Sequence, residues 1–163
     1  MKTFKLHALY LLAGDNESIR QESIPLKDGL IISMENKERT WFIDAVVSEE
    51  DMHFFEGEQK ANRHVFLNVI ITSKDNHPAA MITSIESIKE LSDGYSIIFK
   101  GRIVLGRDDV LEDVLEELLT DGHSTESLLE RFKQRTENLE SYSEKTLNEV
   151  YKDLKESGNY VLL

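Results

Sequence analysis

Apolar and polar residues alternate along most of the first 106 residues, the pattern of strands that bury one face. The first predicted strand covers about residues 3–12 and places these side chains on its buried face: Phe4, Leu6, Ala8, Tyr10 and Leu12. Further strands are predicted at 30–34 (Leu30, Ile32, Met34), 41–47 and 95–105. Pro25 cannot donate a ladder hydrogen bond, so the less regular strand before it should end there or lie at an edge.

Two further segments depart from simple alternation. Residues 64–72 are apolar on both faces, with Phe66 and Ile70 opposite Val65 and Leu67, so both faces should be covered. We expect C-terminal helices to supply the second cover. In residues 81–91 the isoleucines stand three apart, as in a helix, yet the segment is rich in Ile, Thr and Ser. We interpret it as a strand with a bulge near Glu86 and keep a helix as the alternative.

The turns favour an antiparallel barrel. Asp28-Gly29 and Asp93-Gly94 each stand between apolar runs and predict hairpins, because both residue types tolerate positive φ. The first four strands should then form a meander. Seven short strands suggest a small closed barrel filled by side chains, and Gly101 on the inward face fits a tight bend. The predicted fold class is therefore α+β, a small antiparallel β-barrel followed by a pair of helices.

The period changes at Gly106, so we divide the chain into a barrel core, 1–106, and a C-terminal helical pair packed on the barrel, 107–163. A short helix is predicted at about 110–119, ending at Asp121-Gly122, and a long one from about 124 to 157 that could break near Ser141. The long helix extends beyond the short one. Its outer apolar residues must dock on the barrel, for instance at Phe66 and Ile70, or form a helix-mediated dimer: Tyr142, Leu147, Val150, Tyr151 and Leu154.

The stretch from Ser48 to Arg63 is the longest connection. Ser48-Glu49-Glu50-Asp51 resembles a capping box that begins a short helix. Phe54 and Phe55 either cover a barrel end or belong to a binding loop, since long connections often carry binding residues.

Composition narrows the classes of function. The chain has 163 residues, no cysteine and a formal net charge of −12, which argues against duplex DNA and anionic membranes as partners. The absence of cysteine excludes disulfides, thiolate zinc sites and a cysteine nucleophile. We expect a cytoplasmic protein, because the first residues lack the apolar block of a signal peptide and no window is apolar enough to span a membrane.

The sequence carries none of the simple catalytic or phosphate-binding motifs that we searched for. His53, His64 and His77 flank one strand and could bind a metal with Glu50 or Asp75, although ordinary surface histidines are favoured. Asp44, within an apolar strand, is a perturbed carboxylate or simply an outward-facing residue. We expect no catalytic residue, no cofactor and no metal site.

The opening Met1-Lys2-Thr3-Phe4-Lys5-Leu6, the segment Pro25-Leu26-Lys27-Asp28-Gly29-Leu30-Ile31-Ile32 and Trp41-Phe42-Ile43-Asp44-Ala45 together resemble the YwpF-like family of Gram-positive bacteria. The resemblance implies a barrel similar to the tube-forming proteins of type VI secretion, with a helical pair after it. It also implies a link to stress or virulence, but it carries over no catalytic residue.

Two hypotheses for function follow. The first is a non-catalytic interaction or assembly module whose surface includes the long-helix residues above together with Phe54 and Phe55. Its partner would be another protein or a second copy. The alternative is a small-molecule-binding protein or an enzyme with its site near residues 48–63.

Overall fold

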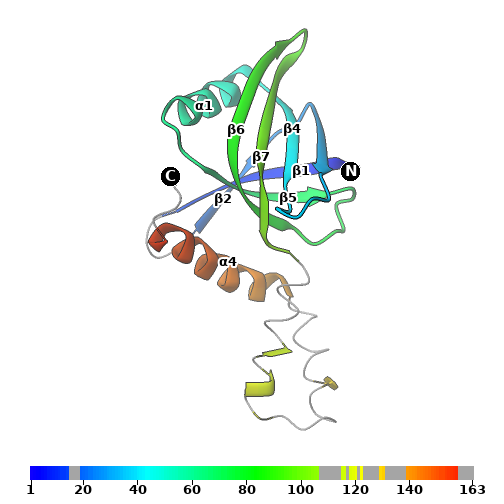
Figure 1. Ribbon diagram of the computed structural model, residues 1–163, viewed down its shortest axis with the longest axis vertical. Helices are drawn as coiled ribbons and strands as arrows, with labels where there is room; N and C mark the ends of the chain where they lie inside the picture. Colours follow the sequence, from blue (N-terminus) through cyan, green and yellow to red (C-terminus); the bar gives the residue numbers. More distant parts are fainter. Residues whose placement is uncertain are drawn as a thin grey trace.

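The computed structural model describes residues 1–14, 19–106, 115–116, 118–120, 122, 129–130 and 139–157, with the side chains of the last range described from 146 onward. The strands are β1 (Lys2–Gly14), β2 (Ile19–Ile24), β3 (Asp28–Ser33), β4 (Trp41–Val47), β5 (Val65–Ile71), β6 (Ala79–Leu91) and β7 (Gly94–Leu105). The helices are α1 (Glu49–Lys60) and α4 (Leu139–Glu156). Figure 1 shows α1 beside the upper part of β6 and α4 below the barrel.

The strands close into an antiparallel barrel. The order of neighbours is β2-β1-β3-β4-β7-β6-β5, and β5 pairs again with β1. Six strands therefore form a closed ring, and β2 is an additional strand outside it. The predicted α+β fold with a small antiparallel barrel is confirmed, and one of the seven strands lies outside the ring. Closure removes the open edges that a flat sheet of the same strands would expose.

Side chains fill the barrel. One apolar cluster gathers the inward residues of the strands together with Met52 and Phe55 of α1, and Ile31, Ile43 and Phe99 within it have no exposed surface. The ring of Phe55 meets that of Phe99 edge-on at 5.2 Å between centroids. Helix α1 thus covers one end of the barrel, and the described interior is packed side chains.

A bulge at His7 changes which side of β1 faces inward. Strand β1 pairs Leu6 with Ile71 and Ala8 with Ile70, so His7 is an extra residue in the ladder. After it, Leu9 and Leu11 belong to the interior cluster, while Leu12 belongs to a second cluster on the outside. The prediction that Ala8, Tyr10 and Leu12 lie on the same face as Leu6 is wrong, because one inserted residue shifts a period-2 pattern to the opposite side. Leu12 is nevertheless buried, in the second cluster.

The ambiguous segment 81–91 is a strand, and the bulge predicted near Glu86 is confirmed. Strand β6 pairs Ile85 with Phe99 and Ser87 with Ile98, which leaves Glu86 unpaired. The bulge lets both Ile85 and Ile88 face the interior cluster, although they stand three apart. The spacing of three residues between Ile85 and Ile88 therefore comes from the bulge, which shifts the register of the strand, and not from a helix. The hairpin at Asp93-Gly94 is also confirmed, with Gly94 at a φ of 117°.

The hairpin predicted at Asp28-Gly29 is wrong. Both residues lie inside β3, opposite Val46 and Ala45 of β4. Strands β2 and β3 do not pair with each other: β2 pairs with residues 9–14 of β1, and β3 pairs with residues 2–5. A Cβ at Gly29 would lie 3.0 Å from the Cβ of Leu6, so this glycine provides space for a core leucine. The first four strands are consequently not a simple meander.

The start of a short helix predicted at Ser48 is confirmed. The Ser48 side chain accepts a hydrogen bond from the backbone N–H of Asp51 and caps α1. At the other end, Asn62 adopts a φ of 54° and Arg63 donates its backbone N–H to the carbonyl of Glu58 at 3.1 Å. This is the Schellman arrangement. Most of the predicted long connection is therefore an ordered helix with both ends capped.

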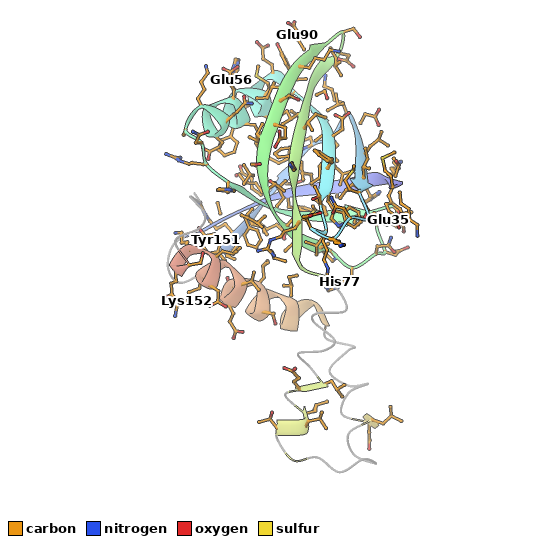
Figure 2. All side chains as sticks on the ribbon, viewed as in Figure 1. Glu35, Glu56, His77, Glu90, Tyr151 and Lys152 are labelled. Carbon is orange, nitrogen blue, oxygen red and sulfur yellow. The ribbon has the colours of Figure 1, made fainter. Side chains whose placement is uncertain are left out.

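Helix α4 packs on the outside of the barrel. Tyr151 stacks on Phe66 with ring centroids 5.9 Å apart and an interplanar angle of 16°. Its hydroxyl donates to the carbonyl of Gly14 at 3.0 Å, and Asn148 Oδ1 accepts the backbone N–H of Ile19 in β2 at 3.0 Å. Figure 2 shows Tyr151 pointing from α4 toward the barrel and Lys152 pointing away. The second cover predicted for Phe66 is supplied by this helix.

The C-terminal helical pair is described only in part. Residues 118–120 are helical, and Gly122, with a φ of 76°, donates its N–H to Leu119, so the first helix ends where predicted. Most of helix 110–119 and residues 124–128 and 131–138 of the long helix lie outside the described residues. Helix α4 runs without interruption through Ser141, the position where a break was considered.

We expect Gly101→Val to lower the free energy of unfolding by roughly 2–4 kcal/mol. A Cβ at Gly101 would lie 2.0 Å from the carbonyl oxygen of Ile82 and 2.8 Å from the Cα of Thr83, so β6 and β7 would have to separate. Urea denaturation measures the loss. Gly57→Ala is the matched control, because a Cβ there meets no atom within 4 Å, and it should raise stability by about 0.5–1 kcal/mol. An unchanged midpoint for Gly101→Val would contradict the close approach.

We expect Tyr151→Phe to cost about 1 kcal/mol, because it removes the hydrogen bond to Gly14 and keeps the stacking on Phe66. Tyr151→Ala should cost about 3 kcal/mol or release α4 locally. Denaturant unfolding and amide hydrogen exchange along α4 separate these two outcomes. Lys152→Ala, at an exposed position of the same helix, should change stability by less than about 0.5 kcal/mol. Equal effects of the three substitutions would contradict the docking.

Candidate functional site

Most residues of the predicted interaction surface are used for packing within the chain. Tyr151 and Leu154 are buried in the second cluster, and Leu147 and Val150 pack against it while remaining partly exposed. Phe55 is fully buried in the barrel, whereas Phe54 is 37% exposed. The side chain of Tyr142 lies outside the described residues. Of this set, Phe54 is the most exposed apolar side chain that the structure describes.

The candidate metal and pocket residues do not converge. Among the described residues, no three His, Asp or Glu side chains come together as metal ligands do. His53 faces Glu49 of its own helix at 3.6 Å. In the segment 48–63 the buried carboxylate is Glu58, whose Oε1 accepts a 3.4 Å hydrogen bond from Arg63 and whose Oε2 has no partner.

Asp44 lies on the outward side of β4. Its neighbours along the strand, Ile43 and Ala45, are fully buried in the interior cluster, so the side chain between them points out. Its carboxylate accepts a 2.6 Å hydrogen bond from the hydroxyl of Ser96 on β7. Of the two interpretations drawn from the sequence, the outward-facing residue is therefore correct.

Apolar side chains surround Asp44 on this side of the barrel. Cross-strand pairing places Leu30 opposite Asp44 and Asp44 opposite Ile98, and residues directly opposite in a ladder point to the same side of the sheet. The neighbouring rows hold Ile32 opposite Phe42, and Val46 opposite Ser96. We call this surface the outer face and define it by its apolar residues: Leu30, Ile32, Phe42, Val46 and Ile98.

The outer face lies outside both apolar clusters of the described residues. Its five apolar residues belong to neither apolar cluster and are not among the side chains packed against them. Leu30 is 44% exposed and the other four are partly exposed. The main contacts of helix α1 are with β6 and β7, and those of α4 are with β2 and β7, whereas β3 and β4 are not among them.

Lysines border the outer face. Lys5 of β1 is opposite Leu30, Lys100 of β7 is opposite Phe42, and Lys89 of β6 is opposite Ser96. All three are exposed. The outer face therefore has an apolar centre around one carboxylate and a cationic rim.

Sequence reasoning assigned part of this surface to the core. Alternation selected Leu30 and Ile32 as the buried side of the third strand, whereas Ile31 between them is the fully buried residue. Two features of the sequence could have indicated the outer face. One is the uninterrupted apolar run 30–32, and the other is the pair Phe42 and Val46, which lie on the side of the next strand that faces away from its core residues. Adjacent strands that are apolar on both sides indicate a second contact surface.

Tyr95, at the start of β7, is the titratable side chain with a raised pKa. Burial is the larger cause, because it disfavours the phenolate, and the charges of Glu49, Glu90 and Glu56 add to it. Glu90 is the cross-strand partner of Tyr95, while Glu49 and Glu56 belong to α1. Figure 2 places Glu56 on α1 and Glu90 near the tip of the hairpin. The packed edge between α1 and β7 is therefore acidic.

We expect Tyr95 to ionise above the ordinary tyrosine pKa of about 10. Because the folded-state pKa is raised, its contribution to stability is complete below the unfolded pKa and is lost as the pH rises toward the folded value. NMR titration of labelled tyrosines measures the step, which Tyr95→Phe should remove. Glu90→Gln should lower this pKa only in part, since burial is the larger cause. A Tyr95 step in the ordinary range would contradict the assigned burial.

The structure contains no helix long and apolar enough to cross a membrane among the residues that it describes.

The sequence model of a family described as "YwpF-like protein" matches residues 2–135. An uncharacterised protein YwpF of Bacillus subtilis (strain 168) is 36% identical over 135 residues, which cover 83% of this chain and 99% of that protein.

A solved structure shares the fold. The crystal structure of a hypothetical protein from Staphylococcus aureus superimposes with a TM-score of 0.58 and 30% sequence identity, covering 84% of this chain and 94% of the other. The family match covers every strand of the barrel and helix α1, while α4 lies beyond it. The chain therefore belongs to the YwpF-like family.

Proposed function

We propose that this protein is a non-catalytic interaction module that binds another protein through the outer face. The observation that carries the proposal is the set of five apolar side chains of β3, β4 and β7 that join neither cluster, with Leu30 44% exposed. We place the protein in the cytoplasm as part of the same proposal.

The energetics favour a partner on this face. Fully burying a large apolar side chain contributes roughly 1.5–3 kcal/mol, and the outer face holds five such residues that are only partly covered. A partner that covers them removes apolar surface from water, and the lysine rim adds selectivity and faster association. The face stands on paired strands of a closed barrel, so little ordering cost accompanies binding.

Fewer features support the alternative, a small-molecule site near residues 48–63. That segment is mostly α1, whose inner side is occupied by Met52, Phe55 and Glu58 against the barrel. Glu58 with Arg63 gives one ion pair rather than several converging ionisable groups. The resemblance to tube-forming barrels adds assembly as an expectation of the same kind as protein binding, because assembly is itself contact between proteins.

We expect Leu30→Glu to abolish specific capture of a protein partner and to leave the barrel folded, because the residue is exposed on the outer face. The measurement is quantitative affinity capture from native lysate, compared with wild-type chain. Leu91→Glu is the matched control, since Leu91 is 40% exposed at the hairpin tip and pairs with Gly94 rather than with one of the five apolar residues of the outer face.

A partner that Leu30→Glu loses and Leu91→Glu retains supports the proposal. Equal capture by the wild-type chain and both variants would assign binding to another surface. The untagged chain is included as a possible partner, so that self-association is measured in the same experiment.

A further inference from the structure

The charges of the outer face favour one kind of binding partner. We infer that the outer face binds a second copy of this chain, related to the first by a twofold axis. This inference rests on the proposed function, because it names the partner of the same surface.

The carboxylate of Asp44 sets the first requirement for any partner. It lies among apolar side chains, and the hydrogen bond from Ser96 is the one that the described residues give it. A partner that covers the outer face takes this charge out of water, which costs several kcal/mol unless a cation or a donor is placed against it. The partner must therefore present a positive group at the middle of an apolar surface.

The lysine rim sets the second requirement. Two of these lysines lie near Asp44. Lys5 is in the same cross-strand row as Asp44, with Leu30 between them, and Lys100 is in the next row, diagonally across from Asp44. A partner that covers the apolar centre approaches these ammonium groups, so it must present carboxylates close to the cation that it offers to Asp44. A second copy carries both groups at this spacing.

Twofold symmetry brings the complementary groups together. If the axis passes between Asp44 and Lys100, near Phe42 and Ile98, then Asp44 of one copy faces Lys100 of the other, and the reverse pair forms at the same time. Phe42 and Ile98 then contact their own equivalents across the axis. Such an isologous contact closes after two copies, because each copy uses the same surface.

The charge of the whole chain favours the same choice. Two chains of net charge −12 repel each other, and the repulsion is strongest where acidic residues gather, as in the first turn of α1. The outer face and its rim carry three lysines, Lys5, Lys89 and Lys100, against Asp28 and Asp44, a local balance of +1. Two copies can therefore approach through this surface without the repulsion found at α1.

The test is the oligomeric state of the full chain, measured by sedimentation velocity over a micromolar concentration series. The wild-type chain should form a dimer whose fraction rises with concentration, and Leu91→Glu should behave in the same way. Asp44→Lys should be monomeric, and so should Lys100→Asp, because each places like charges across the axis. Mixing the two variants in equal amounts should restore a dimer that contains one chain of each kind.

Circular dichroism of each variant establishes that the barrel is intact. Lys100 is exposed, so its substitution tests the contact even if Asp44→Lys disturbs β4, in which case Asp44→Asn replaces it. A wild-type monomer at every concentration overturns the inference, as does a mixture that stays monomeric. The proposed function fails separately, if Leu30→Glu and the wild-type chain capture the same proteins from lysate and the same amount of untagged chain.

Discussion

The pairing of β1 with strands on both of its edges is the constraint on which the rest of the structure depends. β3 pairs with residues 2–5 of β1 and β5 with residues 6–11, and these two ladders close the six-stranded ring. Once the ring is closed, every strand has an inside and an outside. The inside must be filled by side chains, because a barrel of this size leaves no room for water, and the outside becomes available for other contacts.

The outside of the barrel has three regions, of which two are covered by helices. Helix α1 covers one end of the barrel, α4 covers the wall formed by Leu12, Phe66 and Ile82, and the described chain leaves the wall of β3, β4 and β7 uncovered. The same physical need, removal of apolar surface from water, explains all three surfaces. For the first two the cover belongs to the same chain, and this gives the uncovered wall its interest as a binding surface.

Much of the fold could be predicted because alternation, turn residues and capping are local signals. The strand with a bulge at Glu86, the hairpin at Gly94 and the cap at Ser48 were each visible in a few neighbouring residues. The face of each strand was harder, because it depends on the register with distant partners. The bulge at His7 and the close packing of Gly29 under Leu6 are non-local, and periodicity alone cannot reveal them. For that reason the candidate interaction surface was expected on the long helix and at Phe54 and Phe55, and the outer face was not found from the sequence.

Helix α4 is an outer cover of the barrel. It lies beyond residues 2–135, which the family sequence model matches, yet the barrel residues that it touches, Phe66 and Gly14 among them, lie within that range. The helix contacts the wall without entering the ring, so its addition requires no change in the interior packing. In a closed barrel of this kind the interior packing is separate from the outer contacts, so a cover on one wall can be present or absent without altering the packing inside.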